Sequence, residues 1–330
     1  MGRIQSVETL RGLAIIAVVM LHVIMRYGYK FEDTGIYSSI SPWLLFISMP
    51  LFAGISGLVL GLSRKDFTSF EFLKQKAKRL LIPFYVVGTF QYAITIIFHK
   101  ITLTGDDLYQ HLVEGRLRFY FLMSIFTIFT FSLVAGRLKL MEKPWQIISL
   151  MIGFAALTTL PHIAFMALSH SFFLGIYFLL AYLLGKFPDL IQKKTAYGLI
   201  SLFAAIGVGL WLGMTKDMAI ENRHDIPVII FGVFITFSIL VLFIQHNLNS
   251  RILSKIGSYS FGIFILHGFF LPVVDRILFA LGFENVHVHI LLTTFICTLG
   301  SIVAQEILAS STMLRKYFFG AAVPKGYFGK

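Results

Sequence analysis

Long apolar runs occupy most of this chain, and they limit its possible folds more than any other feature of the sequence. A helix needs about 20 mostly apolar residues to cross the roughly 30 Å of hydrocarbon in a bilayer. We therefore predict an all-α, polytopic membrane protein, built as a bundle of about ten transmembrane helices. Their expected ranges are residues 9–26, 42–62, 80–98, 118–135, 145–161, 171–185, 195–214, 226–245, 256–274 and 289–311.

The composition supports this fold class and leaves no room for a separate soluble domain. Hydrophobic residues make up 57% of the 330-residue chain and charged residues only 13%, whereas a soluble domain carries about 25% charged residues. The mean hydropathy is +0.82. The hydrophilic stretches between the runs are too short to fold alone. We expect one transmembrane domain over residues 1–330, with a short cytoplasmic tail at 315–330.

Membrane topology explains the net charge of +12, so no nucleic-acid partner is expected. If the N-terminus is cytoplasmic, the segments on that side hold 20 of the 28 Lys and Arg residues, and the other side holds 8. An excess of this sign is typical of cytoplasmic loops. An even number of spans then places both termini in the cytoplasm. The first run lacks a small-x-small cleavage pattern, so a cleaved signal peptide is not expected.

One loop, RKDFTSFEFLKQKAKRLLIP at residues 64–83, has a helical pattern of its own. The pair Thr68 and Glu71 fits a capping box, and Pro83 fits the first turn of the following span. We interpret the loop as an amphipathic helix that lies on the inner leaflet. Its apolar positions are Phe67, Phe70, Leu73, Ala77 and Leu80, and its basic positions are Lys74, Lys76, Lys78 and Arg79.

The stretch LRGLAIIAVVMLH, residues 10–22, carries two polar side chains inside a membrane-spanning run. Arg11 and His22 are eleven residues apart, which is three helical turns plus about 20°, so they share one face and lie about 16 Å apart along the axis. Glu8 lies on the same face and can pair with Arg11. Ionisable groups cost a few kcal/mol inside a bilayer, so this stripe is expected to face a polar cavity.

Each of these residues also has a purely structural interpretation. Arg11 can anchor the helix by reaching the inner headgroups, and His22 can serve as a hydrogen-bonding group between helices. The alignment of an acid, a base and an imidazole favours a functional role. With an ordinary pKa near 6.5, His22 can take up and release a proton at working pH.

A second polar face lies in SYSFGIFILHGFF, residues 258–270, where Ser260, Phe264 and His267 fall at helical spacing. By itself this pattern is most typical of a packed helix with a hydrogen-bonded histidine. No group of His, Cys, Asp or Glu residues has the spacing of a metal site, so no metal is expected. The chain also lacks a phosphate-binding loop and a nucleophile-elbow motif.

Several segments together resemble the acyltransferase 3 family, integral membrane enzymes that modify cell-surface glycans and other exported molecules. RIQSVETLRGLAIIAVVMLH at residues 3–22 is similar to the opening helix of that family, which has an acidic residue, Leu-Arg-Gly and a later histidine. Further similar segments follow in the family's order. They are MPLFAGISG at 49–57, KRLLIPFY at 78–85, YFLLAYLLGK at 177–186 and SFGIFILH at 260–267.

The chain departs from the family's pattern at four positions, and these departures bear on which acceptor is used. Phe264 stands where the family often has Tyr, and Ser48 where many members have His. Gln75 replaces the first arginine of an Arg-x-x-x-Arg pattern that here ends at Arg79, and Arg118 occupies a position that is typically His.

The resemblance implies transfer of an acyl group, usually acetyl, from cytoplasmic acyl-CoA to a hydroxyl of an exported or lipid-linked cell-envelope polysaccharide. It implies an enzyme of the bacterial inner membrane, with membrane lipids around it and acetyl-CoA as a substrate rather than a bound cofactor. His22 would be the general base, and Glu8 and Arg11 would hold the donor or orient the helix. The substrate-binding residues would be Lys74, Lys76, Lys78, Arg79, Arg118, Ser56, Ser260 and His267.

Two points stay open at this stage. The basic loop suits the CoA phosphates, but plain topology control explains the same charges. A transporter or flippase for a lipid-linked saccharide also suits a bundle with buried charge, although such proteins often contain inverted repeats that this sequence does not show. No serine or cysteine stands out as a covalent nucleophile, so direct transfer is the expected mechanism.

Overall fold

A computed structural model describes residues 2–27, 35–63, 66–99, 109, 119–161, 163, 165–190, 195–215 and 225–320. Every regular element within these residues is helical, which confirms the predicted fold class. By length and apolar composition, eight of the described helices can cross a membrane. The chain is therefore a multi-pass membrane protein.

The chain divides into two compact units. The first unit combines Met1–Leu62 with Leu180–Gln305, and the second combines Ser63–Leu179 with Glu306–Lys330. Arg118, expected to bind substrate, lies outside the described residues.

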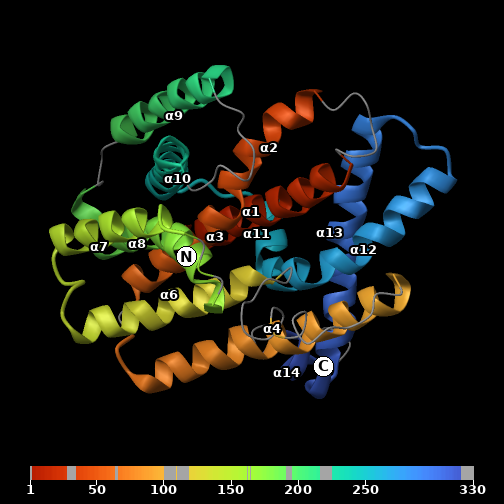
Figure 1. Cartoon of the computed structure of the whole chain (residues 1–330), viewed down its shortest axis with the longest axis horizontal. Helices are drawn as coiled ribbons and strands as arrows, with labels where there is room; N and C mark the ends of the chain where they lie inside the picture. Colours follow the sequence, from red (N-terminus) through yellow and green to blue (C-terminus); the bar gives the residue numbers. More distant parts are fainter. Residues whose placement is uncertain are drawn as a thin grey trace. The chain divides into compact units, whose positions relative to one another are not determined.

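The first unit is built around α1 (Figure 1). Helix α1 packs closely against the short helix α11, and α9 lies alongside α10. The helices that belong wholly or mainly to this unit are α1 (Gly2–Tyr27), α2 (Gly35–Ile47), α3 (Met49–Leu62), α9 (Thr195–Thr215), α10 (Ile226–His246), α11 (Arg251–Ser258), α12 (Ser260–Ala280) and α13 (Val286–Ser310).

The second unit contains α4, which is the longest described helix, and α14 packs against it. Its helices are α4 (Phe70–His99), α6 (Tyr120–Arg137), α7 (Pro144–Thr158), the first part of α8 (Leu168–Lys186) and α14 (Thr312–Phe319).

Two of the ten predicted spans have no counterpart among the described helices that are long and apolar enough to cross a membrane. The run at 145–161 forms α7, a helix of 15 residues that is only about 22 Å long and therefore short for a bilayer. The run at 80–98 is not a separate helix, because it continues from the basic segment as one 30-residue helix, α4.

The predicted start of the amphipathic helix is wrong. Helix α4 begins at Phe70, and its first turn is capped by Ser69, whose Oγ accepts the N–H of Phe72 at 3.3 Å. The Thr68 hydroxyl donates instead to Asp66 Oδ1 at 2.6 Å, so it does not form the expected capping box. Phe70 is 69% exposed rather than part of a buried apolar face.

Pro83 also does not mark the boundary that the sequence predicts. It lies inside α4, which continues as an α-helix to His99. A proline within a helix removes one backbone hydrogen bond, but in a membrane neighbouring groups can satisfy the freed carbonyl. The basic segment and the following apolar segment therefore form one continuous helix.

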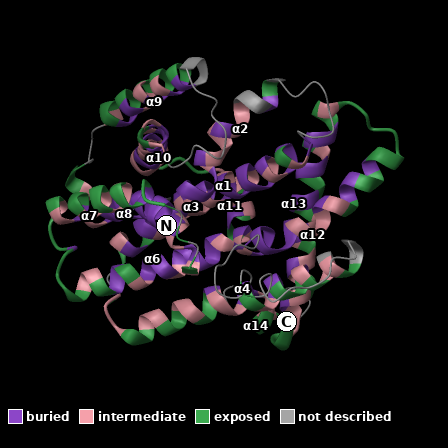
Figure 2. Cartoon of the chain, in the orientation of Figure 1, coloured by how far each residue is buried: buried purple, intermediate pink, exposed green. Residues whose placement is uncertain are grey.

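Packing in the first unit separates α1 into an apolar side and a polar side. Leu10 and Ala14 of α1 belong to a fully buried apolar cluster with residues of α3, α8 and α10. Much of α1 is buried, as Figure 2 shows. Polar side chains on such a helix need partners, because an unsatisfied buried polar group is costly.

Two glycines allow the close approach of α1 and α11. A Cβ at Gly12 would collide with the backbone carbonyl of Leu253, and a Cβ at Gly257 would collide with the carbonyl of Glu8. Small residues of this kind let helix backbones approach closely in membranes. The glycine that follows Arg11 therefore fixes α11 beside the Glu8–Arg11 turn.

Candidate functional site

The two histidines that the sequence singles out on separate helices contact each other in the first unit. His267 Nε2 of α12 lies 3.3 Å from His22 Nδ1 of α1, although 245 residues separate them. Their ring centroids are 5.1 Å apart. The two polar faces predicted separately therefore belong to one site.

Backbone contacts determine which ring nitrogens carry the protons. His22 Nδ1 lies 2.9 Å from the carbonyl oxygen of Val18, and His267 Nδ1 lies 2.8 Å from that of Ile263. A carbonyl oxygen only accepts, so each neutral ring carries its proton on Nδ1. The basic lone pair of each imidazole is then on Nε2.

The two rings differ in accessibility. His22 is half-buried, whereas His267 is 6% exposed. In the Nδ1-protonated tautomer, His267 Nε2 accepts from His22 Nδ1–H and so leaves His22 Nε2 as the basic atom on the more accessible ring. An imidazole can take up and release a proton near neutral pH, and His22 is the more accessible of the two rings.

Near the start of α1, Glu8 and Arg11 form the ion pair that their spacing predicts. Arg11 Nη1 lies 2.5 Å from Glu8 Oε1, and the side chains of Arg11 and Glu8 are 29% and 24% exposed. Among the described residues, the other carboxylate oxygen, Glu8 Oε2, is buried and has no hydrogen-bond partner. A buried acceptor without a hydrogen-bond partner is costly.

A third polar centre was missed by the sequence analysis. Arg26 of α1 donates from Nε to Asp275 Oδ2 of α12 at 3.2 Å. His289 Nε2 of α13 lies 3.5 Å from Asp275 Oδ1 and 2.7 Å from the Tyr27 hydroxyl. That hydroxyl also lies 3.3 Å from Thr293 Oγ1.

One signal in the sequence could have revealed this centre. Arg26 follows His22 by four residues and Asp275 follows His267 by eight, so each lies near the same face of its helix as the histidine. The predicted span 9–26 ends at Arg26 and the predicted span 256–274 ends just before Asp275, so the two residues were not connected.

The remaining predicted residues of the first unit have local hydrogen bonds or lie at a helix start. Ser56 donates to the carbonyl of Phe52 within α3 at 3.0 Å, and Ser260 is the buried first residue of α12. No group of three or more His, Cys, Asp or Glu side chains with the geometry to hold a metal occurs among the described residues.

The four basic residues expected to bind donor phosphates lie on α4 in the second unit, where they differ in environment. Lys74, Lys78 and Arg79 are exposed, and Lys74 Nζ lies 3.9 Å from Glu71 Oε2. Lys76 is half-buried, with its Nζ 4.0 Å from the centroid of the Phe129 ring. This cation–π contact directs Lys76 toward α6, whereas the other three side chains are accessible from the surface.

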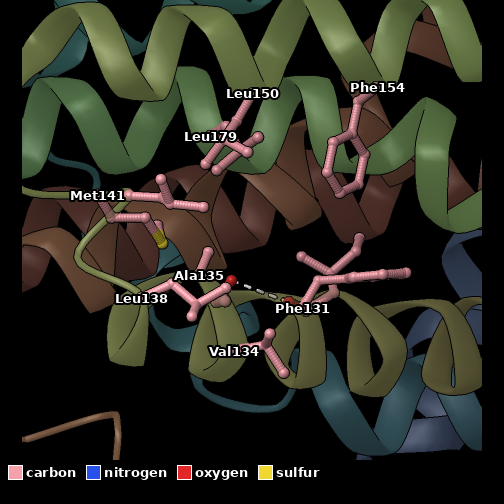
Figure 3. Close-up of a pocket in the computed structure, with 11 residues that line it drawn as sticks. Phe131, Val134, Ala135, Leu138, Met141, Leu150, Phe154 and Leu179 are labelled. Carbon is pink, nitrogen blue, oxygen red and sulfur yellow. Dashed lines mark hydrogen bonds between the residues drawn. The ribbon is translucent and has the colours of Figure 1, made fainter.

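The second unit also contains an apolar hollow of about 120 Å³ between α6, α7 and the segment that follows α6 (Figure 3). Phe131 and Phe154 point into it from α6 and α7. Ser132 is its one polar lining residue, and its hydroxyl donates to the Ile128 carbonyl at 2.8 Å. The hollow therefore offers hydrocarbon contacts and no group for acid–base chemistry.

These features define a multi-pass membrane protein with an imidazole pair on two packed helices. The chain belongs to the acyltransferase 3 family, because the profile of that family's acyltransferase domain matches residues 4–306. It is also 23% identical to YfiQ of Bacillus subtilis (strain 168), provisionally named a membrane-bound acyltransferase, over 96% of this chain and 93% of the relative. No solved structure gives a significant match.

Proposed function

We propose that this membrane acyltransferase moves an acyl group, acetyl in the first instance, from acyl-CoA to a hydroxyl of an exported or lipid-linked cell-envelope polysaccharide. The observation that supports this best is the contact of His22 with His267. Together with the Val18 carbonyl, His267 favours the His22 tautomer whose Nε2 can accept a proton.

In the proposed reaction, His22 Nε2 takes the proton from the acceptor hydroxyl while the hydroxyl oxygen attacks the thioester carbonyl. The carbon–sulfur bond then breaks, the acyl group remains on the acceptor oxygen, and the His22 imidazolium returns the proton to the CoA thiolate. His267 supports the cation, because its Nε2 lies 3.3 Å from His22 Nδ1 and can accept its hydrogen.

Within the first unit, the donor end of the site is assigned to Glu8 and Arg11. Arg11 lies about 16 Å from His22 along the axis of α1, a separation that a pantetheine arm can span. The exposed Lys74, Lys78 and Arg79 suit the CoA phosphates. We further propose that the protein lies in a bacterial inner membrane with both termini in the cytoplasm, because 20 of its 28 Lys and Arg residues then lie inside.

The test is transfer of label from acetyl-CoA to extracted glycan in membrane vesicles. His22→Ala is expected to lower transfer by about 100-fold or more, because it removes the general base. His246→Ala is the matched control, since it makes the same change at an exposed histidine at the end of α10. Transfer that persists in a folded His22→Ala protein would refute the assigned base.

Release of the CoA thiol by purified protein separates the transferase from a flippase. A transferase must break the thioester bond, whereas a flippase for a lipid-linked saccharide has no need of CoA. Absence of thiol release with acetyl-CoA and with longer acyl-CoA donors would contradict the proposed reaction.

A further inference from the structure

Arg26 occupies a defined place relative to the proposed base. It follows His22 by four residues on α1, which puts it about 6 Å farther along the axis and about 40° around it. Both side chains contact α12, His22 through His267 and Arg26 through Asp275. They therefore lie on the same side of α1, with Arg26 beyond His22 as seen from Arg11.

The guanidinium of Arg26 is held by a buried polar cluster formed by Tyr27, Asp275, His289 and Thr293. These four side chains are at most 1% exposed, whereas the Arg26 side chain remains 37% exposed. Arg26 thus lies at the accessible edge of an otherwise closed network. Such a tether fixes the orientation of a long side chain before any ligand arrives, which lowers the entropy cost of binding.

The hydrogen bond to Asp275 uses the Nε–H of Arg26, so this pair does not use the N–H donors on the two Nη atoms. A guanidinium has five N–H donors in a planar fork, and Asp275 accepts from Nε. Within the described residues, Asp275 is the side chain that pairs with Arg26. The Nη groups carry the forked donors that match phosphate and carboxylate.

We propose that Arg26 binds an oxyanion of the acceptor, namely a phosphate of a lipid carrier or a carboxylate of an acidic sugar, one helical turn beyond His22. This inference rests on the proposed function, since it takes His22 as the base that meets the acceptor hydroxyl. It makes Arg26 a specificity residue that favours acidic acceptors over neutral ones.

The competing explanation is that Arg26 and Asp275 merely join α1 to α12. To separate the two, purified full-length protein in lipid nanodiscs is melted with saturating CoA present, so that donor phosphate sites are filled. Glucose 1-phosphate, glucuronate and glucose are the probes. We expect one or both acidic probes to raise Tm and glucose to leave it unchanged.

Arg26→Gln is expected to raise the acidic probe concentration needed for a half-maximal Tm shift by about tenfold or more, because a charge-assisted contact is lost. Arg26→Lys should fall between the two, since it keeps the charge but not the fork. Arg276→Gln is the matched control, since it removes the same charge at an exposed position of α12.

Because Arg26→Gln removes the guanidinium that pairs with the buried Asp275, a double variant, Arg26→Gln with Asp275→Asn, is melted as well. If the double variant still responds to the acidic probes as the parent does, Arg26 only joins the helices and the inference is wrong. It is also wrong if Arg26→Gln and Arg276→Gln weaken the response equally, or if glucose and the acidic probes act alike on the parent.

The outcome separates this inference from the proposed function. If probe binding depends on Arg26 but acyl transfer does not depend on His22, the proposed base is contradicted and the oxyanion site is supported. If acyl transfer depends on His22 but probe binding does not depend on Arg26, only the oxyanion site is overturned. A stronger response to glucose 1-phosphate indicates a phosphate, and a stronger response to glucuronate indicates an acidic sugar.

Discussion

Two arginines of helix α1, Arg11 and Arg26, are paired in different ways. Arg11 pairs with Glu8, three residues away, and both side chains are partly exposed. Arg26 pairs with Asp275, 249 residues away, and this carboxylate is 1% exposed. The first pair is a local consequence of helix geometry, whereas the second exists only because α1 and α12 pack together. We therefore expect the two pairs to respond differently to substitution.

The largest expected effect is on the second pair. Asp275→Ala should lower the free energy of unfolding by about 3 kcal/mol, because it leaves Arg26 and the buried His289 without their carboxylate. Glu8→Ala should cost less than about 1 kcal/mol, because a partly exposed local pair contributes little. Denaturant unfolding in detergent micelles measures both, and equal losses would contradict the distinction.

The next effect concerns the helix that packs beside the Glu8–Arg11 pair. Gly257→Ala should destabilise the protein by about 1–3 kcal/mol, because the added Cβ meets the Glu8 carbonyl and must push α11 away. Gly207→Ala in α9 is the control, since no atom lies within 4 Å of its Cβ position. Thermal melts of both variants, with acyl transfer measured in parallel, test this, and a Gly257→Ala protein as stable as the Gly207→Ala protein would refute it.

A third prediction separates stability from activity at the first pair. Glu8→Gln should change Tm little, but it should lower acyl transfer by about tenfold, because Arg11 loses the charge that orients it. Glu284→Gln removes an exposed carboxylate of the same unit and should leave transfer unchanged. Full transfer by Glu8→Gln would show that the pair only anchors the helix.

The smallest effect is expected at another local contact, before α4. The hydroxyl and the N–H of Thr68 hold the pKa of Asp66 below its ordinary value. The folded state therefore favours ionised Asp66. The resulting stabilisation of the fold is present above the ordinary Asp pKa near 3.9, and it is lost as the pH falls through the lower pKa of the folded state. Asp66→Asn should lower Tm slightly at pH 7 and by a vanishing amount near pH 3. A difference that grows on acidification would contradict the assignment.

The basic segment of α4 shows where the local sequence pattern was a poor guide. The sequence pattern predicted a helix capped at Thr68 and a new span at Pro83, but the helix begins at Phe70 and passes through the proline. Ser69 accepts the N–H of Phe72, while Asp66 captures the Thr68 hydroxyl. Asp66 Oδ1 also accepts the Thr68 N–H that a capping box would give to Glu71, and the sequence pattern does not tell which acceptor succeeds.

The sequence alone determined the features that depend on short separations along the chain. Apolar length predicted a multi-pass helical protein, and helical spacing predicted the Glu8–Arg11 pair. The same spacing placed His22 and His267 each on a polar face of its own helix. These features follow from the fixed pitch of the α-helix, which acts within a few turns.

Only the tertiary structure decided which of those faces meet. The contact of His22 with His267 and the pairing of Arg26 with Asp275 each join residues more than 240 positions apart. Both depend on how α1 packs against α11 and α12, which the close approach at Gly12 and Gly257 helps to fix. The sequence of one helix does not determine which residues of another helix it contacts, because these contacts depend on the packing of all the helices together.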